Sequence, residues 1–184
     1  MSIILPKRRV ARLPAYDYRG YGTYFVTVCT TKRHALFGHV DGDHMVLNDL
    51  GRQVVQGWCE VPTRFASVRV DDVFVVMPNH FHGILDIVDA QAARPLGAIV
   101  GAFKGAVTKY AQDLEPGRVV WQRGFYEHII REEWAHEKIR QYVVANPSLW
   151  SVDRENPRRS GRDPLEEFLQ EHGDDALPAK LDGA

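Results

Sequence analysis

The chain of 184 residues has few of the features that mark secreted or membrane proteins. Its two cysteines, Cys29 and Cys59, form neither a disulfide framework nor a CxxC zinc motif. No run of about 18 apolar residues occurs, so no transmembrane helix is expected. The N-terminus MSIILPKRRVARLP has too short an apolar part for a signal peptide, and its charges lie on the wrong side. A reducing, cytoplasmic setting without a membrane partner is therefore expected.

Several enzyme classes also lack their signatures in this chain. A histidine-triad hydrolase would need a third histidine where Ile84 stands. The HExxH pair of zinc proteases and the PCxxC of zinc deaminases are absent. Neither GxGxxG nor GxxxxGK[ST] occurs, which removes the common dinucleotide and nucleoside-triphosphate loops.

The net charge of −1 conceals an uneven distribution. Residues 163–184 hold seven acids and one lysine, whereas residues 1–162 hold 22 bases and 17 acids. A mildly basic body fits a polyanionic partner, although this excess alone is weak evidence. The acidic tail is expected either as a solvated end or as a regulatory segment.

Hydrophobic periodicity predicts seven elements in the order β-α-β-β-α-β-α. They are a strand at 23–31, a helix at 46–65, strands at 70–77 and 81–88, a helix at 96–112, a strand at 126–131 and a helix at 132–146. The first six match an α+β, ferredoxin-like (split βαβ) antiparallel sheet with two helices on one face and the other face open to a ligand. Residues 1–20 are expected as a basic arm, 21–150 as the domain, and 151–184 as an acidic, mostly irregular tail with a short helix near 164–171.

The stretch VVMPNHFHGIL at 75–85 places two histidines one residue apart in a predicted strand. Alternate strand residues face the same side, so His80 and His82 project together while Phe81 points into the core. Two neutral imidazoles at this spacing can bind one divalent ion, provided that a third ligand comes from elsewhere. The alternative is that both are polar residues on the solvated face of an edge strand.

The helix at 132–146 can supply the remaining groups. Tyr142 and Asn146 are four residues apart and therefore share one helical face. Tyr142 is a candidate nucleophile, and the amide oxygen of Asn146 is a candidate metal ligand. The alternative is that Tyr142 only extends the apolar stripe from Ile139 to Val143.

In combination these motifs resemble those of the REP-associated tyrosine transposases, within the single-tyrosine HUH (His, hydrophobe, His) endonucleases of small insertion sequences. The resemblance covers about residues 20–150 and is carried by YFVTVCT (24–30), VVMPNHFHGIL (75–85), GAFKGAVTKYAQ (101–112), VWQRGFYEHIIR (120–131) and IRQYVVANPSLW (139–150). It implies a ferredoxin-like HUH core, with His80, His82 and Asn146 as ligands of Mg²⁺ or Mn²⁺ and Tyr142 as the nucleophile. It also implies cleavage of single-stranded DNA beside hairpins of the repeated-extragenic-palindrome type, through a 5′-phosphotyrosine that can rejoin ends.

Basic side chains are the expected contacts to this DNA. They lie in the N-terminal arm, in the helix at 96–112 and around the last strand: Lys7, Arg8, Arg9, Arg12, Arg19, Lys104, Lys109, Arg123 and Arg131. For each single residue, solvated surface is the favoured alternative. Tyr110 is a rival nucleophile, but its spacing from Phe103 and Val107 indicates core. His128 is a candidate general base, with a structural role favoured, and Trp121 and Trp150 are expected to be packing anchors.

Two other functions remain open from the sequence. One is a non-catalytic nucleic-acid-binding module on the same sheet, although the aromatic signature of RNA-binding sheets is absent. The other is a replication-type HUH nickase, although the chain has no second tyrosine beside Tyr142 and no sign of a helicase domain. The resemblance allows a monomer, as in REP-associated members, or a homodimer, as in insertion-sequence relatives.

Overall fold

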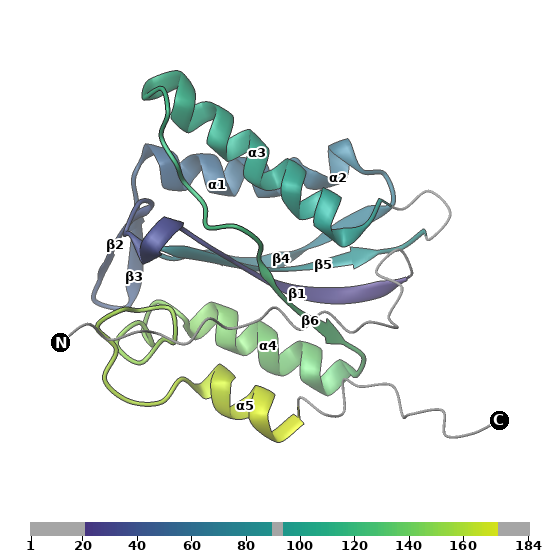
Figure 1. The fold of residues 1–184 in the computed structure, drawn as a ribbon. Coiled ribbons are helices and arrows are strands. Elements are labelled where there is room, and N and C mark those ends of the chain that lie inside the picture. Colours follow the sequence, from purple (N-terminus) through teal and green to yellow (C-terminus); the bar gives the residue numbers. More distant parts are fainter. Residues whose placement is uncertain (1–20, 90–93, 173–184) are drawn as a thin grey trace.

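The structure, a computed structural model, describes residues 21–89 and 94–172. The described chain contains β1 (Gly22–Cys29), the 3₁₀ turn η1 (Thr31–Arg33), β2 (Gly38–Asp41), β3 (His44–Leu47), α1 (Asp49–Cys59), α2 (Val61–Arg64), β4 (Val68–Val76), β5 (His80–Ile87), α3 (Leu96–Leu114), β6 (Tyr126–Ile130), α4 (Glu133–Ala145) and α5 (Pro164–His172). It is a mixed α and β fold in which helices lie on both sides of one sheet (Figure 1). None of the described helices is both long and apolar enough to cross a membrane.

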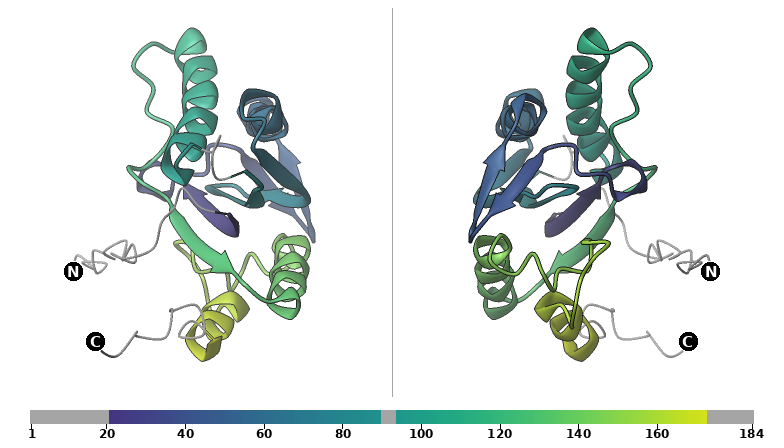
Figure 2. Two further views of the ribbon diagram at one scale, coloured as in Figure 1. Left: turned by 90° about the vertical axis from the view of Figure 1, so that its right-hand side faces the viewer. Right: turned by 90° about the vertical axis from the view of Figure 1, so that its left-hand side faces the viewer.

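The central sheet has four strands in the order β4-β5-β1-β6, and every neighbouring pair is antiparallel. Strands β5 and β1 are therefore the inner pair, and their register places Thr27 opposite His82. Helices α1 and α3 cover one face of the sheet, and α4 and α5 cover the other (Figure 2). An inner strand between two helical layers is buried on both faces, and burial is indeed continuous over residues 24–29 of β1 and 80–85 of β5.

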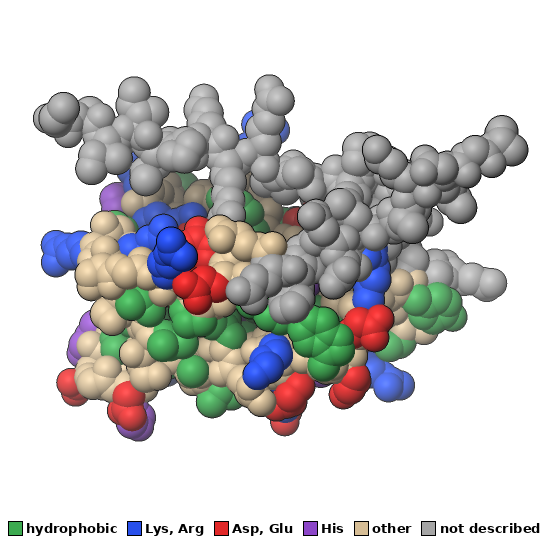
Figure 3. Space-filling view, turned by 90° about the horizontal axis from the view of Figure 1, so that it is seen from below, with side chains coloured by type: hydrophobic (Ala, Val, Ile, Leu, Met, Phe, Trp, Pro, Cys, Tyr) green, Lys and Arg blue, Asp and Glu red, His purple; other side chains and the backbone are tan. Residues whose placement is uncertain are grey.

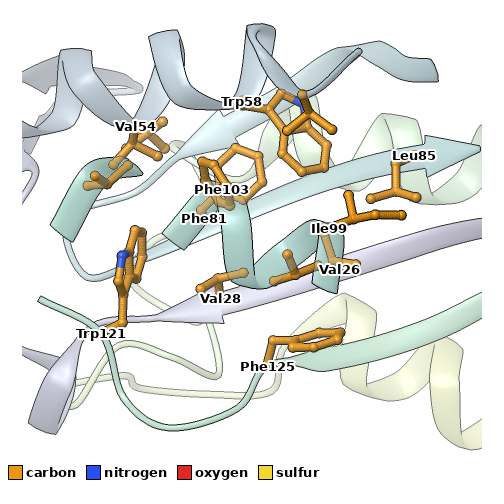
Figure 4. Close-up of a cluster of buried hydrophobic side chains, with 14 of the residues drawn as sticks. Val26, Val28, Val54, Trp58, Phe81, Leu85, Ile99, Phe103, Trp121 and Phe125 are labelled. Carbon is orange, nitrogen blue, oxygen red and sulfur yellow. The ribbon is translucent and has the colours of Figure 1, made fainter. Parts of the chain in front are cut away.

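The main core lies between the sheet and the α1–α3 layer (Figure 4). Trp58 of α1, Phe81 of β5 and Phe103 of α3 form an aromatic cluster, with ring centroids 4.7 to 5.4 Å apart. Tilted and edge-on rings at these distances add to the stabilisation from area burial. Trp121 and Phe125 close the core near β6, so Trp121 is confirmed as a packing residue.

The predicted helix at 46–65 was wrong at its start and in its continuity. Residues 46 and 47 belong to β3, which pairs with β2 in a hairpin that hydrophobic periodicity did not reveal. Helix α1 begins after Asn48, whose side-chain oxygen accepts a hydrogen bond from the Gly51 amide at 2.9 Å. It ends at Cys59, and Pro62 lies in the first turn of the separate helix α2.

The expectation of an open sheet face was also wrong. Helix α4 packs Ile139, Tyr142 and Val143 onto this face, where they meet Phe25 and Ile84 in a second buried cluster. An ion-pair group ties the helix to the sheet edge, since Arg140 donates to Asp71 and Asp72 and His136 lies 3.2 Å from Asp71. Both acids lie at a bulge in β4, where four steps from Val70 to Phe74 oppose two steps of β5.

Gly83 lies between the two helical layers, in the middle of β5. A β-carbon at this position would come within 2.7 Å of both the Trp58 and the Phe81 ring. We expect Gly83→Ala to lower the free energy of unfolding by about 1–3 kcal/mol, because neither packed ring has room to move. Chemical denaturation measures this change.

Gly101 in α3 provides the matched control, because nothing lies within 4 Å of the position that a β-carbon would take there. Gly101→Ala should raise the free energy of unfolding by about 0.5–1 kcal/mol, since alanine restricts the unfolded chain more than glycine does. Equal effects of the two substitutions would contradict this packing. Within the described residues, the position of a β-carbon at Gly105 is equally open.

Candidate metal centre

The two histidines of β5 face the α4 side of the sheet and are fully buried. Their ring centroids are 4.5 Å apart, and the His82 ring stacks on Phe25 at 5.0 Å. Phe81 between them points into the main core, as predicted. The alternative of a solvated edge strand is wrong, because β5 is an inner strand and α4 with its following loop covers both rings.

Hydrogen bonds from the strand ends fix which ring nitrogen is available. His80 Nδ1 lies 2.9 Å from Asn79 Oδ1. Asn79 Nδ2 donates to the backbone carbonyls of Arg33 and Glu155, so its amide oxygen must face His80. An amide oxygen only accepts, and His80 Nδ1 therefore carries the hydrogen while Nε2 keeps its lone pair. His82 Nδ1 is similarly placed, 2.9 Å from Thr27 Oγ1, so a neutral His82 can also present a free Nε2.

Helix α4 brings the predicted tyrosine and asparagine to this pair. The Tyr142 ring lies 5.6 Å from the His82 ring, measured between centroids. Asn146 caps the C-terminus of α4 and is fully buried. Its Nδ2 donates to Asp153 Oδ2 at 2.7 Å, which turns its Oδ1 away from that carboxylate.

An acid that was not predicted completes the group. The chain after α4 turns back over the sheet and buries Asp153, whose Oδ2 lies 3.6 Å from His80 Nε2. Among the described residues, His80, His82 and Asp153 are the three that bring potential metal-ligand atoms within 4.8 Å of one another. Two imidazoles and a carboxylate form a donor set that suits a divalent transition metal.

Unsatisfied atoms give an independent reason to expect an ion here. His80 Nε2, His82 Nε2 and Asn146 Oδ1 are buried and have no hydrogen-bond partner within residues 21–89 and 94–172. Leaving one such buried polar atom unpaired costs about 1–3 kcal/mol. All three are lone-pair donors, so the residues present fit a bound cation, with Asp153 supplying negative charge.

The Tyr142 hydroxyl lies between two carboxylates, 3.3 Å from Asp153 Oδ2 and 3.2 Å from Asp163 Oδ2. It has one hydrogen to donate, so only one of these acids can be satisfied at a time. Burial and the two carboxylates raise the pKa of Tyr142 well above its usual value. Burial likewise raises the pKa of Asp153 and of Asp163. In this arrangement the hydroxyl is protonated and covered.

A relative of known sequence matches most of the chain. It is an uncharacterized protein of Haemophilus influenzae, 40% identical over 166 residues, and the match covers 80% of this chain and 92% of the relative. The chain belongs to the family of this protein. No protein-family model matches the sequence.

A solved structure has the same fold as the present chain. It is described as a REP-associated tyrosine transposase bound to a REP hairpin. The TM-score is 0.52 at 24% identity, over 72% of this chain and 71% of that one. This likeness supports the mixed fold with its antiparallel sheet.

The predicted DNA contacts fall into separate regions. Five of them, from Lys7 to Arg19, lie outside the described residues. Lys104, Lys109 and Arg123 line one groove between α3 and residues 118–123, whereas Arg131 is exposed beside the start of α4. Tyr110 is partly buried against the main core, away from the histidines.

Asp153 and Asp163 are the site residues that sequence reasoning missed. Asp163 was counted with the acidic tail, yet it is buried, and its Oδ1 accepts from the Leu165 amide at 2.9 Å at the start of α5. Such a capping aspartate before a helix was a local signal. Nothing local marks Asp153, because its position depends on how the chain folds back after Pro147.

A first prediction concerns metal-dependent stability. Mn²⁺ at about 100 times its Kd should stabilise the folded protein by about 2.7 kcal/mol, which raises Tm by several degrees. His82→Gln should lose this shift, because it removes one of the two imidazole ligands. The exposed His39 gives the control, and His39→Gln should keep the shift. A His82→Gln protein with an undiminished shift would place the metal elsewhere. Differential scanning calorimetry measures both.

A second prediction concerns pH in the absence of metal. Burial lowers the pKa of His80 to about 4, against the opposing charge of Glu155, and also holds the pKa of His82 well below its usual range. The unfolded chain therefore binds more protons between about pH 6.5 and pH 4, so this contribution to stability is lost as pH falls. For His80 alone the loss at pH 5 is about 2 kcal/mol.

The raised pKa values of Asp153 and Asp163 favour the folded state as pH falls, which opposes the effect of the histidines. The test therefore compares the acid-induced loss of stability in the wild type with that in a histidine variant. Urea unfolding in chelator at pH 7 and pH 5 should show a larger acid-induced loss in the wild type than in His80→Gln. Equal losses in the two proteins would show that His80 is not neutral in the folded state.

Proposed function

We propose that this protein is a metal-dependent single-strand DNA endonuclease and strand transferase of the single-tyrosine HUH type, built on a ferredoxin-like core. One observation carries the proposal: two buried imidazoles with free Nε2 atoms lie against the helix that bears Tyr142. The sheet order β4-β5-β1-β6 supports the ferredoxin-like assignment. The solved structure of similar fold is described as a tyrosine transposase bound to a REP hairpin, which supports hairpin DNA as the partner.

His80, His82 and Asp153 would hold the ion, and Asn146 would offer Oδ1 as a further ligand. We infer Mn²⁺ or Mg²⁺, and the two nitrogen ligands favour Mn²⁺, since Mg²⁺ is usually bound through oxygen. When bound, the ion supplies Lewis-acid stabilisation of charge on the scissile phosphate and of the leaving 3′ oxygen.

Tyr142 would attack the phosphorus atom, forming the phosphotyrosine bond as the bond to the 3′ oxygen breaks. The phenolic proton must leave Tyr142, and Asp153 or Asp163 is placed to accept it through the existing hydrogen bonds. The leaving 3′ oxygen takes up a proton from solvent. The resulting 3′ hydroxyl can reverse the step by attacking the phosphotyrosine as it loses this proton, which rejoins DNA ends. Residues 150–165, which cover Tyr142, must shift before a phosphate can reach the hydroxyl.

The basic side chains predicted from the sequence, including Lys104, Lys109 and Arg123, remain the proposed contacts to the hairpin. The second candidate is a binding module without catalysis. The covered and protonated Tyr142 favours it, because that hydroxyl is not poised for attack in this arrangement. The two functions differ in whether a covalent protein–DNA adduct forms.

Tyr142→Phe should abolish the covalent adduct with labelled single-stranded hairpin DNA in Mn²⁺, because it removes only the nucleophilic oxygen. Binding of the same hairpin should stay within a few fold of wild type. Tyr110→Phe is the matched control and should keep the adduct. A denaturing gel reads out the adduct, and its presence in Tyr142→Phe but not in Tyr110→Phe would assign the nucleophile to Tyr110.

A further inference from the structure

A second basic groove lies beside the metal centre, and none of the residue roles proposed so far explains it. It has a volume of about 530 Å³ and runs between the turn that follows β1 and the loop that follows α4. We call it the Trp150 groove, and its basic and aromatic lining residues are Lys32, Arg33, His34, His39, Trp150 and Arg158. In space-filling view, several Lys and Arg side chains, with acidic side chains next to them, lie at the left end of the α4–α5 face, the end where residues 146–163 lie in Figure 1 (Figure 3).

The charge of this groove is positive and largely uncompensated. Among the residues that the structure describes, no acidic side chain lines it. Lys32 and Arg158 are exposed, and in the described part of the chain neither has a carboxylate partner. Arg33 differs, because it is half-buried and paired with Glu155. The groove therefore presents two free cations to a polyanion.

The other basic groove, beside α3, is already neutralised in part. Lys109 pairs with Asp113 at 2.7 Å, and Arg118 pairs with Glu115 at 3.1 Å. Lys104 is held by two backbone carbonyls, those of Gln122 and Gly124. An anionic strand would have to displace these contacts, which makes the Trp150 groove the better site for a phosphate chain next to the metal centre.

Two residues connect the groove directly to the histidines. Trp150 is half-buried, and its ring centroid lies 6.1 Å from that of His80. Asn79 lines the groove and also accepts the hydrogen bond from His80 Nδ1. Trp150 and Asn79 therefore belong both to the groove and to the surroundings of His80.

The wall opposite Trp150 is held in an unusual backbone conformation. Lys32 and Arg33 have φ angles of 52° and 57°, in the left-handed region that residues with side chains rarely adopt. The turn is supported by Thr30 Oγ1, which donates to the His34 carbonyl at 2.7 Å. Backbone strain of this kind persists where the surrounding structure enforces it, and it is frequent at ligand sites. Lys32 and His34 of this turn are exposed and line the groove.

We propose that the Trp150 groove binds the single-stranded DNA next to the scissile phosphate, with one base stacked on Trp150 and backbone phosphates beside Lys32 and Arg158. This inference rests on the proposed function and adds to it the path of the unpaired strand. An aromatic face with flanking cations is the usual way in which proteins bind unpaired nucleotides without reading their sequence. The hairpin stem would lie elsewhere, so the two parts of the DNA are separable in experiment.

The test compares a fluorescein-labelled DNA hairpin that carries a single-stranded extension of about ten nucleotides with the same hairpin without the extension. All proteins carry Tyr142→Phe, so that cleavage does not interfere, and binding is measured by fluorescence anisotropy. The extension should strengthen binding, and Lys32→Ala/Arg158→Ala should remove most of this gain. The double substitution should also reduce the slope of log affinity against log salt concentration for the extended hairpin, by about 0.7 for each phosphate contact that is lost. Trp150→Ala should weaken binding of the extended hairpin about tenfold, and Trp150→Phe should restore part of it.

The matched control removes the same charge elsewhere. Arg69→Ala/Lys138→Ala alters two exposed cations outside both basic grooves and should keep the gain from the extension. Three results would overturn the proposal. The extension could still strengthen binding in Lys32→Ala/Arg158→Ala, its effect could be lost equally in the control, or it could have no effect in the reference protein. An RNA extension that bound more tightly than DNA would overturn the assignment to DNA.

Failure of the proposed function gives a different result from failure of the groove. In one case, the wild-type protein forms no adduct, but the increase in affinity from the single-stranded extension still depends on Lys32 and Arg158. The protein would then be a binding module, and the groove proposal would stand. In the other case, the adduct forms, but the increase in affinity from the extension is the same with and without the Lys32 and Arg158 side chains. The proposed enzymatic function would then stand, and the groove proposal would be rejected.

Discussion

The burial of two histidines with free Nε2 atoms is the constraint on which the rest of this structure depends. His80 and His82 sit on an inner strand under a helix, where water cannot reach them. Burying polar groups without partners is unfavourable unless another interaction offsets the loss. The neighbouring groups are the unpaired Asn146 oxygen and the Asp153 carboxylate, and every one of them can donate electrons to a cation. The polar groups buried on this face thus have the composition and spacing that could hold an ion.

The same arrangement explains why α4 and the following loop fold onto the sheet together. Arg140 anchors the helix to the β4 bulge, which aligns Tyr142 with His82. Asp153 then bonds both Asn146 and Tyr142 from the returning chain. The Asp153 carboxylate contacts Asn146, the Tyr142 hydroxyl and His80, so a change in its charge alters its interaction with each of them. The protonation state of Asp153 therefore affects its hydrogen bonds with both Asn146 and Tyr142.

Local patterns were enough to predict most of the elements. Alternation in β5 correctly placed His80 and His82 on one side and Phe81 on the other, and spacing in α4 placed Tyr142 and Asn146 near them. The hairpin of β2 and β3 was missed because its two strands are only four residues each. The covered face was missed because burial of polar residues depends on long-range packing. Asp153 was missed for the same reason, since only the return of the chain after α4 brings it to His80. The roles of Tyr142 and Asn146 stay predictions.

The central claim is that His80, His82 and Asp153 bind one divalent ion. A crystal structure of the protein grown in Mn²⁺, with an anomalous difference map, tests it most directly. The account predicts one strong peak about 2 Å from the Nε2 atoms of both histidines and from a carboxylate oxygen of Asp153. A map without a peak there, in which both Nε2 atoms instead bond to protein or water, would contradict it.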